Sequence, residues 1–428
     1  MTMRSAAVVV LGATMTMVGA GCGSSAAVKA AERGDYAALR AALAQEQKDG
    51  QLDRGEARAV ANAVVRREVS EGKGDDGVAR VNELRGCAEQ ARDVLDDRSE
   101  KSDEPAAASA LLLLDEQLAG SGRWRKRASD SDPGWRAVGA RSLVDDDEEG
   151  DERRALFNDM VTSVRRAAFR ASFDAGDGRD RGLLLEAVRV DPDDEVRATA
   201  ARSVGRMADQ DVVLALKDRW YGSSDLVRAS IVRAWATSSS YGRGGREQLF
   251  WVAESDRGST SLTAATLLLR HAGDDGAVGR GAMLRALDEG ATPLRVAAIN
   301  QANLGDEAQL ELVKKASEAG DGQVKVAALS RLVERKDSRA RSLEELATVA
   351  QAEGPARNAA RSALARARDR RVVTLLADDT RATEPGVRAW AASELAAMHE
   401  FPHAAQTLAD DDVSVRTRAA CAILASSH

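Results

Sequence analysis

The sequence predicts an all-α protein: an α-solenoid of about ten helical hairpins, preceded by a helical N-terminal cap. Three features predict this fold. An apolar residue followed by a basic one recurs along the chain, with steps of 28 to 35 residues between consecutive pairs. An alanine stands three positions after the basic residue in most repeats, and prolines precede the helices that carry these pairs. The pairs are Trp135-Arg136, Val164-Arg165, Val196-Arg197, Val227-Arg228, Leu294-Arg295, Val324-Lys325, Ala356-Arg357, Val387-Arg388 and Val415-Arg416, with Leu262-Thr263 as a variant that lacks the base.

The repeat is clearest between Asp191 and Ala208, which we expect to form one helix. Pro192 suits the first helical position, where its missing N–H costs nothing. The acidic residues that follow it suit the positive end of the helix dipole. Val196, Ala200 and Val204 are spaced to share one face, which we expect to be buried.

The alanine column marks where a neighbouring helix comes close. It comprises Ala168, Ala200, Ala298, Ala328, Ala360, Ala391 and Ala419. Six of the 7 prolines precede a repeat helix, and Pro402 opens the next helix after a break. Proline is thus absent from helix interiors, where it would cost about 3 kcal/mol. Pro105 indicates one further repeat, at about 104–115.

Second helices are expected between the repeat helices, at 183–190, 212–220, 247–253, 308–319 and 342–352. Residues 1–22 are expected to be a signal peptide, 23–103 a helical region of diverged or capping repeats, and 104–428 the solenoid. Within 23–103, helices are expected at 27–33, 36–45, 54–69 and 78–95. The acidic run 145–152 and the segment 237–245 are expected to be loops.

The acidic helix start, the Val-Arg pair and the Ala-Ala step resemble HEAT repeats, especially the short bacterial class found in phycobilin-lyase-type proteins. The resemblance covers residues 104–428 and implies a fold, but it says little about function. It also implies that arginines of successive repeats form an internal hydrogen-bonded ladder with aspartates. The ladder arginines would be Arg136, Arg165, Arg197, Arg228, Arg295, Arg357, Arg388 and Arg416.

Composition narrows the class of protein. Aromatic residues make up only 3% of the chain, which suits thin, closely packed helices and disfavours a large globular enzyme core. The 61 basic and 68 acidic residues leave a net charge of −7, whereas a nucleic-acid-binding domain would be basic. We therefore expect no nucleic-acid partner, and the sequence points to no cofactor.

The N-terminus is typical of an export signal. A 15-residue uncharged run, 6–20, follows Arg4 and is too short to span a membrane. Small residues then precede Cys22, and Gly23 with two serines follows it, so the segment resembles a bacterial lipobox with Gly19 at an atypical position. We expect lipidation of Cys22 and, since no aspartate follows it, anchoring to the outer membrane. The alternatives are cleavage after Ala20, giving a soluble exported protein, and a misread start.

Residues 399–403 match the zinc-protease motif H-E-x-x-H. That site needs both imidazoles on one face of an unbroken helix. Pro402 interrupts the helix before His403, and the repeat register places His399 at the end of the preceding helix. We therefore predict no metal site, and a zinc hydrolase acting through His399 and His403 is only the least favoured alternative.

Cys87 and Cys421 lie near opposite ends of the expected array. With helix layers about 8–10 Å apart, they should be many tens of ångströms apart, whereas a disulfide needs Cα atoms within about 7 Å. We expect no bridge between them.

A second arginine column is the candidate binding site. Five residues beyond the ladder position stand Arg141, Arg170, Arg202 and Arg233, where later repeats have Asn300, Ser330, Ser362 and Ser393. Five helical steps turn these side chains away from the ladder, toward an exposed flank. Guanidinium groups repeated in successive layers could bind a carboxylate-rich or phosphorylated partner.

The expected function is therefore that of a non-enzymatic protein-binding or scaffold lipoprotein of the bacterial cell envelope. Its partner would be a protein, with acidic groups facing the arginine column. One alternative is an enzyme accessory or lyase-like HEAT protein. Another is an obligate subunit of an envelope machine.

Overall fold

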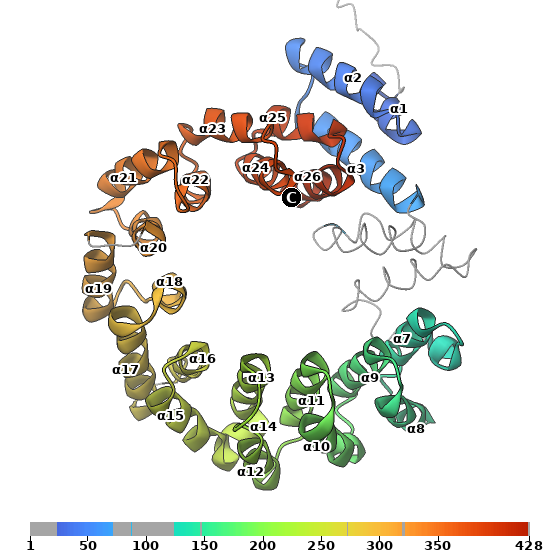
Figure 1. The fold of residues 1–428 in the computed structure, drawn as a ribbon, viewed down its shortest axis with the longest axis vertical. Helices are drawn as coiled ribbons and strands as arrows, with labels where there is room; N and C mark the ends of the chain where they lie inside the picture. The colour runs from blue at the N-terminus through green and yellow to red at the C-terminus, as the bar shows by residue number, and fades with distance from the viewer. Residues whose placement is uncertain are drawn as a thin grey trace, which may run out of the picture.

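The computed structural model describes residues 24–71, 87, 124–145, 148–271, 273–318 and 322–426. Within these ranges the ordered elements are all helices. Successive hairpins place one helix on the inner side and the next on the outer side of a curved array (Figure 1). The predicted all-α solenoid is confirmed.

The inner helices carry the apolar–basic pairs. They are α7 (Pro133–Arg141), α9 (Thr162–Ala175), α11 (Asp194–Arg206), α13 (Asp225–Trp235), α16 (Ser259–Leu268), α18 (Thr292–Gln301), α20 (Gly322–Leu332), α22 (Arg357–Arg366), α24 (Pro385–Ala397) and α26 (Val413–Ala425). The outer helices are α8 (Glu148–Ala155), α10 (Arg181–Val190), α12 (Gln210–Asp218), α15 (Arg246–Ser255), α17 (Asp274–Glu289), α19 (Glu307–Glu318), α21 (Arg339–Gln351), α23 (Val372–Asp379) and α25 (Phe401–Ala405). Five outer helices match the five predicted second helices to within a few residues.

The N-terminal region begins with α1 (Ala26–Arg33), α2 (Tyr36–Lys48) and α3 (Arg54–Glu71). Ser25 and Asp35 cap the first two helices by accepting hydrogen bonds from backbone N–H groups three residues later. Gly34, at φ 71°, takes the left-handed conformation that ends α1 and starts the turn into α2. The predicted helix 78–95 and the repeat near Pro105 lie outside the described residues.

The alanine column packs as predicted. All seven alanines are fully buried, at 0% exposure. Their small side chains let each of these inner helices pack closely against its neighbour. The backbones of α11 and α13 approach even more closely at Gly205, because a Cβ atom there would lie 2.6 Å from the Cβ of Ala234 in α13. Close helix–helix contact therefore explains the Ala-rich sequence.

Three local predictions are wrong. Asp193 is the cap of α11, since its carboxylate accepts from the Val196 N–H at 2.9 Å, so Pro192 precedes the helix instead of opening it. Residues 148–152 of the acidic run are helical and begin α8. Residues 238–240 form the short helix α14 (Ser238–Ser240), whereas Arg243 and Gly244 have non-helical backbone angles and form a kink before α15.

The array curves back onto its own beginning. Helix α3 packs against α26, and α2 packs beside the short 3-10 helix Gln406–Ala409 (Figure 1). Arg40 of α2 donates to the Ala409 carbonyl at 2.8 Å and to Asp411 at 2.7 Å. Apolar side chains of the two ends, including Val64 and Ile423, belong to one buried cluster. The N-terminal region therefore packs against the last repeat as well as preceding the first.

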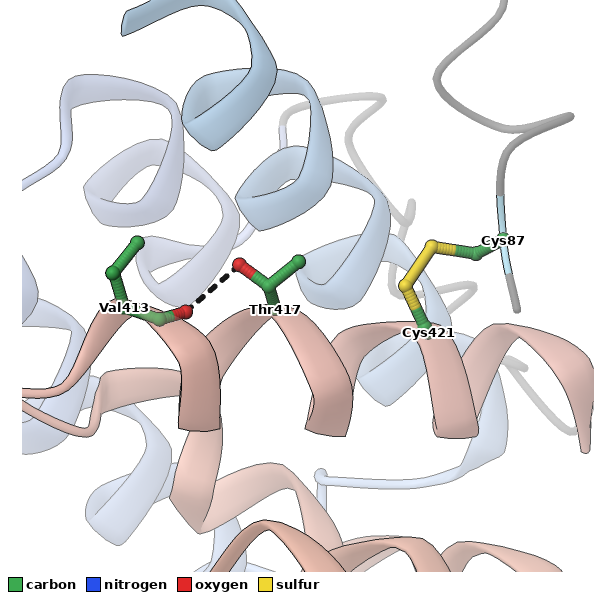
Figure 2. Close-up of a disulfide and its surroundings, with 4 residues drawn as sticks. All are labelled: Cys87, Val413, Thr417 and Cys421. Carbon is green, nitrogen blue, oxygen red and sulfur yellow. Dashed lines mark hydrogen bonds between the residues drawn. A yellow bond between two sulfur atoms is a disulfide. The ribbon is translucent and has the colours of Figure 1, made fainter. Parts of the chain in front are cut away.

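Cys87 and Cys421 form a disulfide, with Cα atoms 4.9 Å apart (Figure 2). The prediction that they lie far apart is wrong. It assumed a straight array, in which the distance between two residues grows with the number of repeats that separate them. A small rotation at every hairpin accumulates instead into a curve that returns the last helix to the N-terminal region.

Candidate functional site

The arginine ladder forms wherever an aspartate stands at the start of the next repeat. Arg136 binds Asp159 through Nε at 2.7 Å and Nη2 at 3.2 Å, and Arg165 binds Asp191 at 2.8 and 3.0 Å. Arg388 binds Asp410 in the same way, at 2.8 and 2.9 Å. The hydrogen bond that Arg165 donates to Asp191 is the main cause that raises the pKa of Arg165. These arginines join consecutive repeats, as the resemblance implied.

The ladder is incomplete elsewhere for a simple reason. The aspartates stand five residues before the apolar member of the next pair, and Gly222 and Arg257 occupy that position after α11 and α13. Arg197 consequently binds Asp194 of its own helix, and Arg228 donates to the Trp220 carbonyl at 3.2 Å. Arg295 likewise donates to a backbone carbonyl, that of Leu287. Arg357 reaches a different aspartate, Asp379, at 3.0 Å. The ladder prediction is thus wrong at Arg197, Arg228 and Arg295.

The second arginine column is not uniform. Arg141 is buried, at 1% exposure, and its Nη2 lies 2.6 Å from Asp174 Oδ2 of α9. The expectation that Arg141 is exposed is wrong, because the next repeat supplies a carboxylate that holds its charge inside. Arg202 and Arg233 are exposed and Arg170 is half-buried. We refer to Arg170, Arg202 and Arg233 as the arginine stripe.

The stripe runs across three adjacent inner helices. Helix α9 packs against α11, and α11 packs against α13. Arg202 donates to Thr199 Oγ1 at 3.3 Å, and Arg233 to the Ala229 carbonyl at 3.4 Å, both within their own helices. Neither has an ion-pair partner among the described residues. Partial burial, and then repulsion from Arg170 and Arg233, lowers the pKa of Arg202.

The carboxylates of α11 and α13 are kept away from Arg202 and Arg233. The acidic residues of α11 are confined to its first turn, where Asp194 binds Arg197 and Glu195 binds Arg166. The single acidic residue of α13 is Asp225, at its first position. Asp174 of α9 is held by Arg141. Among the described residues, the charges of Arg202 and Arg233 are therefore not neutralised by ion pairs from α11 or α13.

Arg206 and Phe173 extend the site and were missed in the sequence. Arg206 lies one turn beyond Arg202 and donates to the Phe173 carbonyl at 2.6 Å. The Arg206 guanidinium carbon lies 4.8 Å from the Phe173 ring centroid, and that of Arg170 lies 5.7 Å from it. The i, i+4 spacing of Arg202 and Arg206 was a usable signal for the arginine. Phe173 lies three residues after Arg170 on α9, and this i, i+3 spacing was likewise a usable signal for the aromatic ring.

The stripe ends at α16. The equivalent position there is Leu268, which is fully buried. In later inner helices this position carries the neutral side chains named above, and Ser362 donates to Glu394 of α24. Arginine at this inner-helix position is therefore restricted to the part of the curve before α16.

His399 and His403 do not share a helix. Helix α24 ends at Ala397, His399 has a left-handed φ of 63°, and α25 begins at Phe401 with Pro402 in its first turn. His399 Nε2 lies 3.3 Å from an Arg368 guanidinium nitrogen, a cationic neighbour that disfavours a bound metal ion. The described residues contain no group of three or more His, Cys, Asp or Glu side chains placed to hold a metal.

Cys22 and the rest of 1–23 lie outside the described residues. In the part of the chain that the structure describes, no helix is both long and apolar enough to cross a membrane.

Comparison with known proteins gives distant structural likenesses. No family model matches the sequence, and no curated protein matches it. Among solved structures, the complex of CpcE and CpcF of phycocyanin lyase from Nostoc sp. PCC7120 is similar at 18% identity with a TM-score of 0.33. That match covers 52% of this chain and 91% of the other. An engineered protein is also similar at 18% identity, with a TM-score of 0.27, covering 83% of this chain and all of the other.

Proposed function

We propose that this protein is a non-enzymatic binding protein, and that the arginine stripe on its inner helices binds an acidic segment of a partner protein. The observation that carries the proposal is the state of Arg202. Its guanidinium lies between two other arginines in the neighbouring repeats and has no carboxylate partner among the described residues. Positive charges held close together and partly removed from water repel one another, which is unfavourable. A bound anion would replace this repulsion with attraction to each guanidinium group.

Arginine is suited to this task. Its planar guanidinium offers several N–H donors in a fixed arrangement that matches a carboxylate or phosphate. The ladder pair of Arg165 and Asp191 joins α9 to the next repeat, and the close contact of Gly205 with Ala234 joins α11 to α13, so the stripe is preorganised on rigid elements. A preorganised surface loses less conformational entropy when it binds.

We further propose that the protein is exported and anchored to the outer membrane through lipidated Cys22. The apolar run at the N-terminus and the small residues before the cysteine support this location. The Cys87–Cys421 disulfide supports it independently, because disulfides persist in oxidising compartments such as the periplasm.

The binding proposal is tested by replacing the whole stripe. The variant Arg170→Gln/Arg202→Gln/Arg233→Gln should bind a fluorescein-labelled glutamate-rich peptide at least about tenfold more weakly than the unmodified protein at low salt. Three other exposed arginines, each ion-paired to an acidic side chain, provide a control of equal charge change: Arg189→Gln/Arg370→Gln/Arg381→Gln. Equal weakening in both triple variants would mean that net charge alone attracts the peptide, and the site assignment would be wrong.

A further inference from the structure

A cavity of about 310 Å³ lies beside α16, between two repeats of the array. Its walls come from the loop before α16, from α16 itself, the second half of α17 and the first turn of α18. Its volume is at the lower end of the range for small-molecule sites, about 300–1,000 Å³. Helix α16 is also the inner helix in which Thr263 replaces the ladder base. The cavity therefore lies at a repeat that lacks its ladder arginine.

The three intact ladder pairs show how this fold holds a guanidinium group between repeats. Arg136 donates through Nη1 to the carbonyls of Asp130 and Ser131, six and five residues before it, at 2.8 and 3.2 Å. Its Nε and Nη2 bind the carboxylate of the next repeat. Arg165 and Arg388 make the same set of contacts. A ladder site therefore consists of two loop carbonyls and one carboxylate.

The cavity retains these acceptor positions without the arginine. Counted from Thr263, the residues six and five positions earlier are Arg257 and Gly258. The residue five positions before Leu294, the apolar member of the next pair, is Glu289. Arg257, Gly258 and Glu289 all line the cavity. The exposed Glu289 carboxylate has no ion-pair partner among the described residues, so it is available to a guanidinium group of a ligand.

Two arginines of the cavity wall restrict the ligand further. Arg257 and Arg285 each donate to a backbone carbonyl at the end of α15, at 2.6 and 2.7 Å, and neither has an ion-pair partner among the described residues. The second acidic residue of the wall, Asp256, already accepts from Thr260 and from backbone N–H groups of its own loop. These two arginines would repel a ligand that carries only a guanidinium group, whereas a ligand with a carboxylate as well can pair with them.

We propose that this cavity binds an arginine whose α-carboxylate is free, either as the amino acid or as the C-terminal residue of a peptide. The ligand's guanidinium group takes the place of the missing ladder arginine, with Glu289 and the two loop carbonyls as acceptors. Its carboxylate pairs with Arg257 and Arg285. This site is separate from the arginine stripe and goes beyond the function proposed above.

Isothermal titration calorimetry on the intact chain tests the ligand. L-Arginine should bind at least about tenfold more tightly than citrulline, in which a neutral urea replaces the guanidinium group, and than agmatine, which lacks the carboxylate. The tripeptide Gly-Gly-Arg separates the two sources: binding at least as tight as that of L-arginine identifies a chain end, and weaker binding identifies the free amino acid. Equal binding of citrulline, or no binding of L-arginine and the tripeptide up to about 1 mM, would overturn the proposal.

Substitutions test the position of the ligand. Thr263→Arg restores the missing base of α16, so its side chain should fill the cavity, pair with Glu289 and abolish binding of L-arginine. Circular dichroism checks that the variant is folded. Glu289→Gln should weaken binding at least about tenfold. The control is Asp288→Asn, which makes the same change of charge at the neighbouring exposed residue, paired with Lys315, and should bind like the unmodified protein. Undiminished binding in Thr263→Arg, or equal weakening in Glu289→Gln and Asp288→Asn, would show that the ligand does not occupy the ladder position.

Discussion

Arg416, the last arginine of the ladder, binds Glu68 of α3, 348 residues away in sequence. Its Nε and Nη2 donate to the same carboxylate oxygen at 3.1 and 2.8 Å. Tyr36 also donates to this oxygen, and the Arg416 guanidinium carbon lies 3.8 Å from the centre of the Tyr36 ring. Arg136, Arg165 and Arg388 bind an aspartate of the following repeat, and Arg416 does not. The N-terminal region supplies a carboxylate instead, so the ladder continues across the closure.

Removing this carboxylate should weaken the closure of the array. Glu68→Ala leaves the buried Arg416 charge without its partner, and breaking a buried ion pair costs about 3–5 kcal/mol. We expect a clear loss in the free energy of unfolding, measured by urea denaturation. The exposed pair of Arg381 and Asp378 provides the control, since Asp378→Ala should change stability by less than about 0.5 kcal/mol. Equal effects of the two substitutions would contradict a structural role for Glu68.

The disulfide should also stabilise the closed form. It joins residues 334 apart, and restricting so large a loop in the unfolded chain is worth about 4–5 kcal/mol or more in the chain-entropy treatment. Cys421→Ser should therefore lower the Tm. The protein denatured without reductant should show no reactive thiol at Cys87 or Cys421, as measured by mass spectrometry after alkylation. Alkylation of both cysteines under these conditions would show that the bond is absent.

Arg141 and Arg202 occupy equivalent positions but should respond differently to substitution. Arg141→Ala leaves Asp174 without its buried partner and should cost about 3 kcal/mol of unfolding free energy. Arg202→Ala removes an exposed charge that two other arginines repel, so stability should stay within about 0.5 kcal/mol or rise slightly at low salt. Thermal melts of both variants decide this point. A large loss in Arg202→Ala would mean that Arg202 has a structural role like that of Arg141.

Stability should fall in acid partly through Asp306, at the start of α19. Hydrogen bonding from Arg280 of α17 is the main cause that lowers its pKa to about 2. An unfolded aspartate titrates near about 3.9, so the stabilisation is present above that pH and is lost as the pH falls toward 2. The difference in urea midpoint between the unmodified protein and Asp306→Asn should therefore be constant above about pH 5 and shrink toward pH 2. A difference that stays unchanged down to pH 2 would contradict the assigned pKa.

The lipid anchor is tested at Cys22. Cys22→Ser should move the protein from the membrane fraction to the soluble fraction in a bacterial host, and should abolish labelling by an alkyne fatty acid. Cys87→Ser is the control, since it also removes a thiol but leaves the N-terminal segment unchanged. Membrane association that persists in Cys22→Ser would refute lipidation at this residue.

The sequence alone determined the repeat architecture, because its signals are local. A pair such as Val196-Arg197, the buried alanine at 200 and the prolines before helices each report on one hairpin and its nearest neighbour. The ladder pairs were predictable in the same way at Arg136, Arg165 and Arg388, because an aspartate stands at a fixed number of residues into the next repeat. It failed at Arg197, where the corresponding position is Gly222.

Only the tertiary structure decided which residues meet across the whole curve. Cys87 meets Cys421, and Glu68 meets Arg416, because the rotation between successive hairpins accumulates over the array. That rotation depends on how side chains pack at every interface, and no single repeat encodes it. The same packing decided the arginine column: Asp174 reaches Arg141 and buries it, whereas no carboxylate of α11 or α13 beyond the first turn is available to Arg202. The helical position of these arginines was evident in the sequence, but their partners were set by neighbouring helices.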